Sequence, residues 1–451
     1  MNETNHSPDG IDDHHHIDDH HIPLRTEDGD LTEDLKEEVD PADPQDQMEG
    51  DVLEVVPLEE VGVQLDNSAY RVVGTGQNNC FNNRQPSQCP ASDASFYGQD
   101  AQKPGPCPSY KNNGDGTITD LNTGLMWQRD PGQKKSLSEA LKQVKSFRLA
   151  GYTDWRVPTI KELYSLVNFN GRTQRSVSQS IPYLDSNYFV FKFGDQSGGE
   201  RMIDSQALSS TKYVSRTMFG DRTLFGVNFA DGRIKGYPVY DPRTRGSKKF
   251  YAYFVRGNTA YGKNNFVANG DGTVTDRATK LMWMQMDSGH FKVGQNRDGA
   301  LNWQQALRWA ETAQYAGYSD WRLPNVKELQ SIVDYTRSPD TTASAAIDPV
   351  FQSTPITNEG GKRDFAQYWS STTHMEGPSD RAGSQGAYVA FGRCLGFMRN
   401  WNSGYTLLDV HGAGSQRSDP KSGNPGNYPN GRGPQGDVIR IYNLVRLVRN
   451  A

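Results

Sequence analysis

GYTDWRVPTIKEL, at residues 151–163, returns almost unchanged as GYSDWRLPNVKEL at residues 317–329. Nine of the thirteen positions are identical. Two copies of so long a string in one chain indicate an internal duplication. The fold is therefore expected to follow from what one copy of this motif builds.

Each copy reads as the start of a helix. A proline ends an extended segment, and a polar residue follows with a glutamate three residues later, which is the spacing of a capping box. Thr159 with Glu162, and Asn325 with Glu328, fit this pattern. No histidine or cysteine accompanies the glutamate in both copies, so we interpret the motif as scaffold and not as a duplicated catalytic acid. Its structural residues are Trp155, Arg156, Glu162, Trp321, Arg322 and Glu328.

The acidic and basic residues beside each tryptophan give a further expectation. Asp154 is expected to pair with Arg156, and Asp320 with Arg322, as a short ion pair under the indole ring.

Other segments recur in the same order. NNGDGTITDLNTGLMWQRD returns as ANGDGTVTDRATKLMWMQMD at a shift of 156 residues, whereas the DWR motif is shifted by 166. The second copy therefore carries a ten-residue insertion between these landmarks. GVNFADGRIKGY in the first copy is matched with YVAFGRCLGF in the second. The expected parts are a disordered acidic tail (1–66), a lead-in segment (67–106) and two repeats (107–258 and 264–451).

Each repeat is predicted to hold two helices followed by a meandering antiparallel sheet, which is an α+β fold. Asn302 is expected to cap the first helix of the second repeat. The GDGT strings are read as hairpin turns and not as calcium loops, because the alternating oxygen ligands of an EF-hand are missing.

Charge is unevenly distributed along the chain. The net charge of −6 combines a net −20 in residues 1–70 with +14 in the remainder. A basic body suits an anionic partner, although the tail and the body could instead neutralise each other. No nucleic-acid-binding motif is present. The tail holds six of the nine histidines, and either weak metal capture or a plain hydrophilic leader would explain them.

Cysteine use is sparse. Cys80 and Cys89 flank a short polar loop and are expected to form a disulfide. Cys107 and Cys394 could pair only if the two ends of the body meet. No run is long and apolar enough to span a membrane, and no signal peptide is visible.

The second repeat ends with a long Gly/Pro-rich stretch, residues 411–437. Irregular segments of this length are often functional. Cations and aromatic rings gather in and before it, and they could hold a charged sugar; the alternative is a packed loop that joins the repeats. The predicted ligand-binding residues are Arg399, Trp401, Tyr405, His411, Arg417, Lys421, Tyr428 and Arg432.

Taken together, NGDGT-x-TD, GLMW, GY-x-DWR-x-P-x-x-KEL, WSST and a closing VR-x-VR resemble the bacterial DUF1566 family, or Lcl C-terminal domain, named for a collagen-like adhesin of Legionella. The resemblance implies two tandem C-type-lectin-like domains, export or surface display, and members that bind sulfated glycans. Leu447 stands where many relatives have cysteine, and Leu208 stands where the second repeat has Trp369.

The expected function is therefore a non-catalytic extracellular or cell-surface protein that binds anionic or sulfated glycans, without a cofactor, a metal site or catalytic residues. The alternative is a protein-binding subunit of a surface assembly, with the acidic tail as its docking segment. An oxidase like the formylglycine-generating enzyme is disfavoured, because such enzymes need paired cysteines late in the chain and Cys394 stands alone. The sequence leaves the oligomeric state open.

Overall fold

The computed structural model describes residues 69–241, 244–400 and 404–451. All of them belong to one compact unit, Asp66–Ala451. The predictions made for the acidic tail and its histidines lie outside the described residues. The repeats at 107–258 and 264–451 remain a division by sequence, since both are parts of this one unit.

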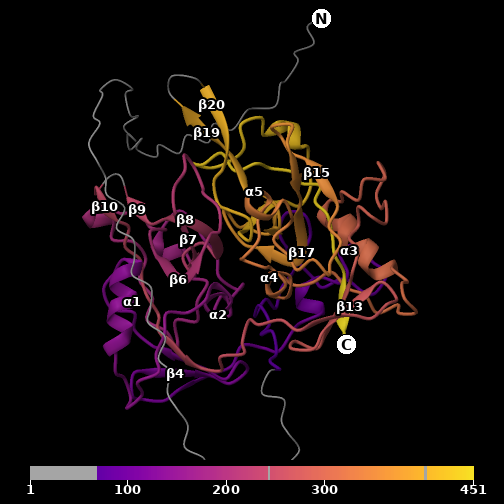
Figure 1. Cartoon of the computed structure of the whole chain (residues 1–451). Coiled ribbons are helices and arrows are strands. Elements are labelled where there is room, and N and C mark those ends of the chain that lie inside the picture. Colours follow the sequence, from indigo (N-terminus) through magenta and orange to yellow (C-terminus); the bar gives the residue numbers. More distant parts are fainter. Residues whose placement is uncertain (1–68, 242–243, 401–403) are drawn as a thin grey trace, which may run out of the picture. The chain divides into compact units, whose positions relative to one another are not determined.

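The described residues form an α+β structure with five α-helices and antiparallel sheets (Figure 1). In the first repeat the elements are β3 (Tyr110–Asn112), β4 (Thr117–Asp120), β5 (Leu125–Gln128), α1 (Leu137–Ser146), α2 (Ile160–Tyr164), β6 (Gln206–Lys212), β7 (Thr223–Asn228), β8 (Arg233–Pro238), β9 (Tyr240–Asp241), β10 (Gly246–Ser247) and β11 (Val255–Gly257).

The second repeat has the same plan with additions. Its elements are β12 (Phe266–Ala268), β13 (Thr273–Asp276), β14 (Leu281–Met284), α3 (Trp303–Thr312), α4 (Val326–Ser331), α5 (Pro339–Thr342), β15 (Pro355–Thr357), β16 (Arg363–Phe365), β17 (Gln367–His374), β18 (Gln385–Ala390), β19 (Leu395–Asn400), β20 (Gly404–Asp409), β21 (Gln416–Pro420) and β22 (Val448–Asn450).

Each repeat keeps one sheet to itself and shares another. The private sheets have four strands in the orders β11-β5-β4-β3 and β12-β13-β14-β22. The shared sheet has six strands in the order β17-β18-β21-β8-β7-β6, so the three strands of one repeat meet the three of the other in mirror order. The junction is the antiparallel β21–β8 pair, where Gln416 faces Ile234.

This sheet corrects one of the sequence matches. The strand of the second repeat that corresponds to β8 is β21, because both lie at the centre of the shared sheet next to β7 and β18, respectively. The sequence match of residues 388–397 with the β7–β8 region therefore does not extend to β19, which forms a two-stranded hairpin with β20 outside the shared sheet. Local sequence similarity suggested this match, but which strands correspond is decided by their positions in the shared sheet.

The repeated motif builds a capped helix in both repeats, as predicted. Thr159 and Glu162 form a full capping box at α2, and Asn325 and Glu328 form one at α4. Asn302 likewise caps α3. The predicted hairpin turn at GDGT is also present, since Asp115 Oδ1 accepts hydrogen bonds from Thr117 N and Oγ1 between β3 and β4.

The expected ion pairs have different partners. The two motif arginines bind the capping-box glutamates: Arg156 lies 2.5 Å from Glu162, and Arg322 lies 2.5 Å from Glu328. The two aspartates turn outward to the last strand of each private sheet, where Asp154 meets Arg256 and Asp320 meets Arg449, both at 2.7 Å. Side chains two positions apart in an extended segment lie on the same face, so local geometry alone would allow the expected pairs. The tertiary partners decided the pairing instead.

A central core is shared by the repeats and includes Trp127 and Trp283. A smaller core lies under the first helix of each repeat. Trp155 belongs to the one in the first repeat, and Trp321 to the one in the second. Leu208 and Trp369, where the repeats differ, are both fully buried in these smaller cores. The difference between the copies there is one of packing.

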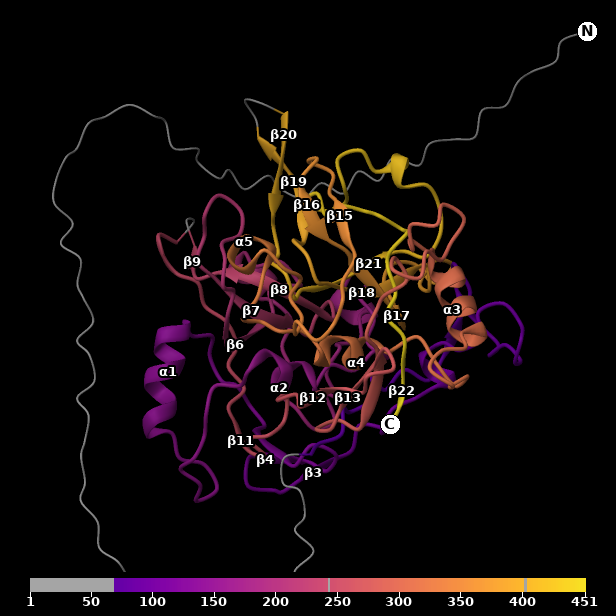
Figure 2. The ribbon, with the colours of Figure 1, turned by 45° about the vertical axis from the view of Figure 1, so that its right-hand side comes forward.

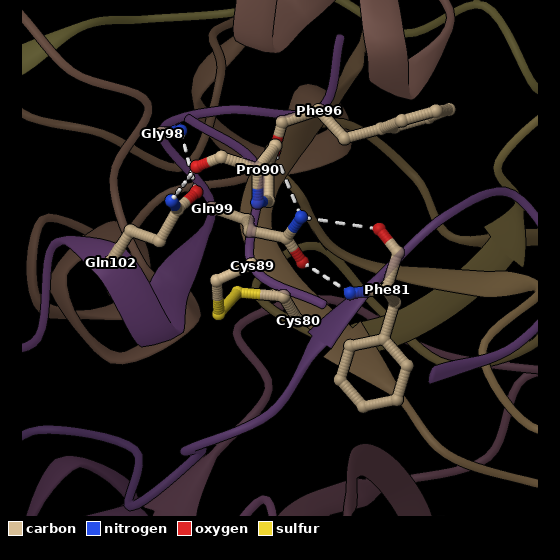
Figure 3. Close-up of a disulfide and its surroundings, with 8 residues drawn as sticks. All are labelled: Cys80, Phe81, Cys89, Pro90, Phe96, Gly98, Gln99 and Gln102. Carbon is tan, nitrogen blue, oxygen red and sulfur yellow. Dashed lines mark hydrogen bonds between the residues drawn. A yellow bond between two sulfur atoms is a disulfide. The ribbon is translucent and has the colours of Figure 1, made fainter. Parts of the chain in front are cut away.

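The lead-in segment is held by the predicted disulfide between Cys80 and Cys89, next to the short strands β1 (Cys80–Phe81) and β2 (Pro86–Ser87) (Figure 3). Gln99 ties this hairpin to the following chain. Its side chain accepts a hydrogen bond from Phe81 N at 2.7 Å and donates to Phe81 O at 3.1 Å. Cys107 and Cys394 are both free thiols, one exposed and one buried, so the pairing considered for them does not form.

Candidate functional site

The second repeat has three segments that the first lacks or keeps short. The first repeat joins β7 to β8 through residues 229–232, whereas the second joins β18 to β21 through residues 391–415, which contain the β19–β20 hairpin. We call this hairpin the arm; it extends away from β18 and β21 (Figure 2). The other two segments are the insertion before α3, at residues 288–300, and the long stretch between β21 and β22, at residues 421–447.

These three segments enclose a groove of about 530 Å³, which we call the second-repeat groove. The turn between β15 and β16 supplies one further residue. The groove is lined by Asn296, Asp298, Ala300, Glu359, Phe397, Pro425, Gly426, Tyr428, Pro429, Val438, Ile439, Arg440 and Tyr442.

Its charged groups are fixed by hydrogen bonds. Arg440 Nε and Nη2 donate to the two carboxylate oxygens of Glu359 at 2.8 and 2.9 Å. Partial burial by itself would raise the pKa of Glu359, but the bidentate contact with Arg440 outweighs it and lowers that pKa. Asp419, which is fully buried, accepts hydrogen bonds from Arg440 N and Ile441 N, both at 3.0 Å. The floor of the groove is thereby tied to strand β21.

Aromatic rings line the groove beside these charges. Tyr442 is 42% exposed, and Tyr428 is half-buried in the turn that follows a short 3-10 helix at Pro425–Asn427. Asp298 and Asn296 are exposed on the insertion before α3. The groove thus presents two tyrosine rings with two carboxylates, one guanidinium and one amide.

Three of the predicted ligand-binding residues are buried, which corrects their assignment. His411 and Lys421 are fully buried, and Arg417 is 8% exposed. Arg417 and Lys421 belong to or directly follow β21, a central strand of the six-stranded sheet, so neighbouring strands cover them. The sequence alone places these side chains in an irregular stretch, whereas β21 buries them inside the sheet.

Each of these three groups is bound within the protein. Asp437 receives a hydrogen bond from Arg417 Nε at 3.0 Å, and its other oxygen lies 2.8 Å from His411 Nε2. Burial lowers the pKa of His411 to about 4, although the Asp437 carboxylate opposes this shift. Lys421 Nζ donates to Thr373 Oγ1 at 2.7 Å and lies 3.8 Å from the centre of the Trp303 ring.

The other predicted residues in the described part of the chain do not converge on one site. Arg399 and Tyr405 are exposed cross-strand neighbours on the arm. Arg432 is partly exposed and lies 3.3 Å from Glu376. Trp401 lies outside the described residues. Tyr428 alone of the eight lines the second-repeat groove.

Sequence reasoning missed Tyr442, Arg440, Glu359 and Asp298 in this groove. One signal was available for Asp298, since it lies in the ten-residue insertion that the two repeat shifts had already located. Glu359 gave no such signal, because only the fold brings the β15–β16 turn beside residues 438–442.

The described part of the chain also bears on metal sites and membrane spans. In residues 69–241, 244–400 and 404–451, no three His, Cys, Asp or Glu side chains are grouped so that they could hold a metal ion. Across the same ranges, none of the helices has the length and apolar character needed to cross a membrane.

A family model described as the Lcl C-terminal domain matches residues 116–256 and 272–407, which together make up more than half of the chain. The chain belongs to this family. The chain carries two tandem copies of the domain. Membership of this family indicates an adhesin-type surface protein. The second match ends within β20, so β21 and the long stretch after it lie beyond the matched region. No curated protein and no solved structure matches the chain.

Proposed function

We propose that this protein is a non-catalytic cell-surface binding protein that recognises carbohydrate through the second-repeat groove. The observation that carries the proposal is the make-up of that groove. Three segments specific to the second repeat converge on two tyrosine rings and a fixed set of polar groups. Concave sites with aromatic walls and a few placed polar groups are the usual form of small-ligand sites.

The polar groups suit a ligand rich in hydroxyls. Carboxylates accept short hydrogen bonds from hydroxyl groups, and a guanidinium donates to ring or hydroxyl oxygens. Glu359 and Arg440 hold each other in place, which limits the entropy lost on binding. Tyrosine rings offer a flat apolar face with a polar tip, and the C–H face of a pyranose can stack against it.

The charge of the groove changes the ligand class expected from the sequence. Its lining has the carboxylates of Asp298 and Glu359 and the single cation of Arg440. The predicted cations Arg417 and Lys421 are buried elsewhere. We therefore propose an uncharged saccharide in place of the anionic or sulfated glycan. The C-type-lectin-like description of the two domains remains part of the proposal.

The absence of catalysis is likewise part of the proposal. An oxidase of the formylglycine-generating type needs a reactive pair of thiols. Cys394 is buried, and burial raises its pKa, which disfavours the reactive thiolate.

A glycan array that includes neutral, amino, uronic and sulfated sugars, run at two ionic strengths, tests the proposal. We expect binding of neutral sugars that changes little with salt and weakens at least about tenfold, or 1.4 kcal/mol, on Tyr428→Ala or Tyr442→Ala. Tyr405→Ala is the matched control, because Tyr405 is an exposed tyrosine on the arm outside the groove lining.

Two results would reject this proposal. One is that no glycan binds. The other is salt-sensitive binding to sulfated sugars that the groove variants leave intact, which would return the site to the exposed cations such as Arg399 and Arg432.

A further inference from the structure

The lysine of the repeated motif joins the two repeats reciprocally. Lys161 Nζ donates to Ser331 O at the end of α4, and Lys327 Nζ donates to Ser165 O at the end of α2, both at 2.7 Å. The two serines, like the two lysines, are 166 residues apart. The repeats therefore face each other across a local pseudo-two-fold axis. The surroundings of Lys161 can be compared with the equivalent surroundings of Lys327.

On the side of the second repeat, the lead-in segment fills the space beside this lysine. Gly74 O accepts a hydrogen bond from Lys327 Nζ at 3.0 Å. Asp100 Oδ2 accepts one from Thr372 Oγ1 at 2.6 Å. Thr75 O accepts one from Phe169 N at 2.8 Å. Main chain at residues 74–75 and one carboxylate, from the separate 3-10 helix Asp100–Gln102, thus occupy this position.

The lead-in segment also covers the end of β17. The side-chain amide of Gln77 binds the main chain of Thr373 twice. Gln77 Oε1 accepts a hydrogen bond from Thr373 N at 2.9 Å, and Gln77 Nε2 donates one to Thr373 O at 2.7 Å. Thr372 and Thr373 are fully buried as a result. Their counterparts in the first repeat are Thr211, which is half-buried, and Lys212, which is exposed.

On the side of the first repeat, the equivalent space is open. It is a groove of about 640 Å³, which we call the first-repeat groove. Its lining includes Lys161, Thr211 and Tyr335, the counterparts of Lys327, Thr372 and Phe169. The full lining is Arg156, Thr159, Ile160, Lys161, Glu162, Thr211, Thr259, Tyr261, Gly262, Lys263, Asn264, Phe266, Ile332, Val333, Asp334, Tyr335 and Asp348.

The local chemistry of the two sides matches. Ile160 N donates to Thr211 Oγ1 at 3.0 Å, as Val326 N does to Thr372 Oγ1 at 3.0 Å. A threonine whose oxygen already accepts from the main chain is left with its hydroxyl proton to donate. In the second repeat that proton goes to the Asp100 carboxylate.

Lys161, which lines the same groove as Thr211, favours the same type of acceptor. Lys161 Nζ binds Asn264 Oδ1 at 2.9 Å and Ser331 O, so both of these hydrogen-bond acceptors are uncharged oxygens. Burial lowers the pKa of Lys161 to about 8, with the nearby Asp276 and Asp334 opposing the shift. An added carboxylate would stabilise the charged ammonium.

We propose that the first-repeat groove is a docking site for a partner polypeptide that presents an aspartate or glutamate. The carboxylate accepts a hydrogen bond from Thr211 and lies near Lys161, as Asp100 does with Thr372 and Lys327. This site is separate from the second-repeat groove.

The test uses the full chain and a fluorescein-labelled peptide with the sequence of residues 95–105, SFYGQDAQKPG, beside a twin in which the aspartate is asparagine. Binding is measured by fluorescence anisotropy. We expect the aspartate peptide to bind at least about tenfold more tightly than its twin, the effect of one charge-assisted hydrogen bond. Thr211→Val should bring the aspartate peptide to the level of the twin and leave the twin unchanged.

Two further variants guard against indirect effects. Thr211→Ser keeps the hydroxyl and should keep the preference for aspartate, whereas Tyr428→Ala alters only the second-repeat groove and should leave peptide binding unchanged. The proposal is overturned if neither peptide binds, if the two peptides bind equally, or if Thr211→Val has no effect on the aspartate peptide.

Discussion

The two motif tryptophans give a matched test of how a buried indole N–H contributes to stability. Trp155 and Trp321 are 5% and 2% exposed. Each packs edge-on against a ring, Phe147 for the first and Tyr318 for the second, and Trp321 also lies beside the tilted ring of Tyr315. They differ in one hydrogen bond: Trp321 Nε1 donates to Tyr315 O at 3.2 Å, whereas Trp155 Nε1 is buried with no acceptor among the described residues.

Replacing each tryptophan with phenylalanine removes the same apolar atoms, so the difference between the variants isolates the N–H group. Trp321→Phe also loses a hydrogen bond with a net value of about 1 kcal/mol. Trp155→Phe removes a buried unpaired donor, whose desolvation costs about 1–3 kcal/mol. Trp321→Phe is therefore expected to lower the free energy of unfolding by about 2–4 kcal/mol more than Trp155→Phe.

Urea unfolding followed by far-UV circular dichroism measures this difference, because six other tryptophans complicate the fluorescence of either variant. The midpoints are compared at a common slope. The double variant serves as a control, and its effect should equal the sum of the single effects because the two residues lie in separate cores. An equal or larger cost for Trp155→Phe would refute the reasoning.

Three further predictions follow from the described contacts. The double change Cys80→Ala with Cys89→Ala should lower stability by about 3 kcal/mol through lost loop closure, and a reductant should reproduce this in the wild type but not in the variant. Arg417→Ala should cost about 3–5 kcal/mol because it leaves the largely buried Asp437 carboxylate without its arginine, whereas Arg432→Ala, at a half-exposed ion pair, should cost under about 1 kcal/mol; thermal unfolding distinguishes them. Burial raises the pKa of Asp419 to about 6 from an unfolded value near 3.9, so its contribution to stability is present below about pH 4 and lost as pH rises through 6. Asp419→Asn should therefore gain thermal stability relative to the wild type between pH 4 and pH 7, and a constant difference across that range would contradict this.

Local features of the fold could be predicted because their causes are local. A capping box needs only residues three positions apart, and Thr159–Glu162 and Asn325–Glu328 form as expected. The turn at Asp115 is likewise set by neighbours two residues away. The disulfide between Cys80 and Cys89 closes a short loop.

The candidate sites could be predicted only in part. Composition pointed to residues 411–437, which contain β21, and Tyr428 in this stretch does line a groove. The same composition suggested Lys421 and Arg417 as surface ligands, although both are covered by neighbouring strands. A cation in a Gly/Pro-rich stretch has the same local sequence whether it faces solvent or an adjacent strand, so burial had to come from the sheet.

The sequence by itself determined that the chain is a tandem duplication, where each capped helix begins, and that the second repeat carries a ten-residue insertion before the DWR motif. Only the tertiary structure decided that the repeats share one six-stranded sheet and that Lys161 and Lys327 each bind the other repeat. It also decided that the lead-in segment covers the second repeat and leaves the first-repeat groove open. The reason is physical: caps and turns join residues a few positions apart, whereas strand order and burial depend on contacts between residues more than 160 positions apart, which no local pattern encodes.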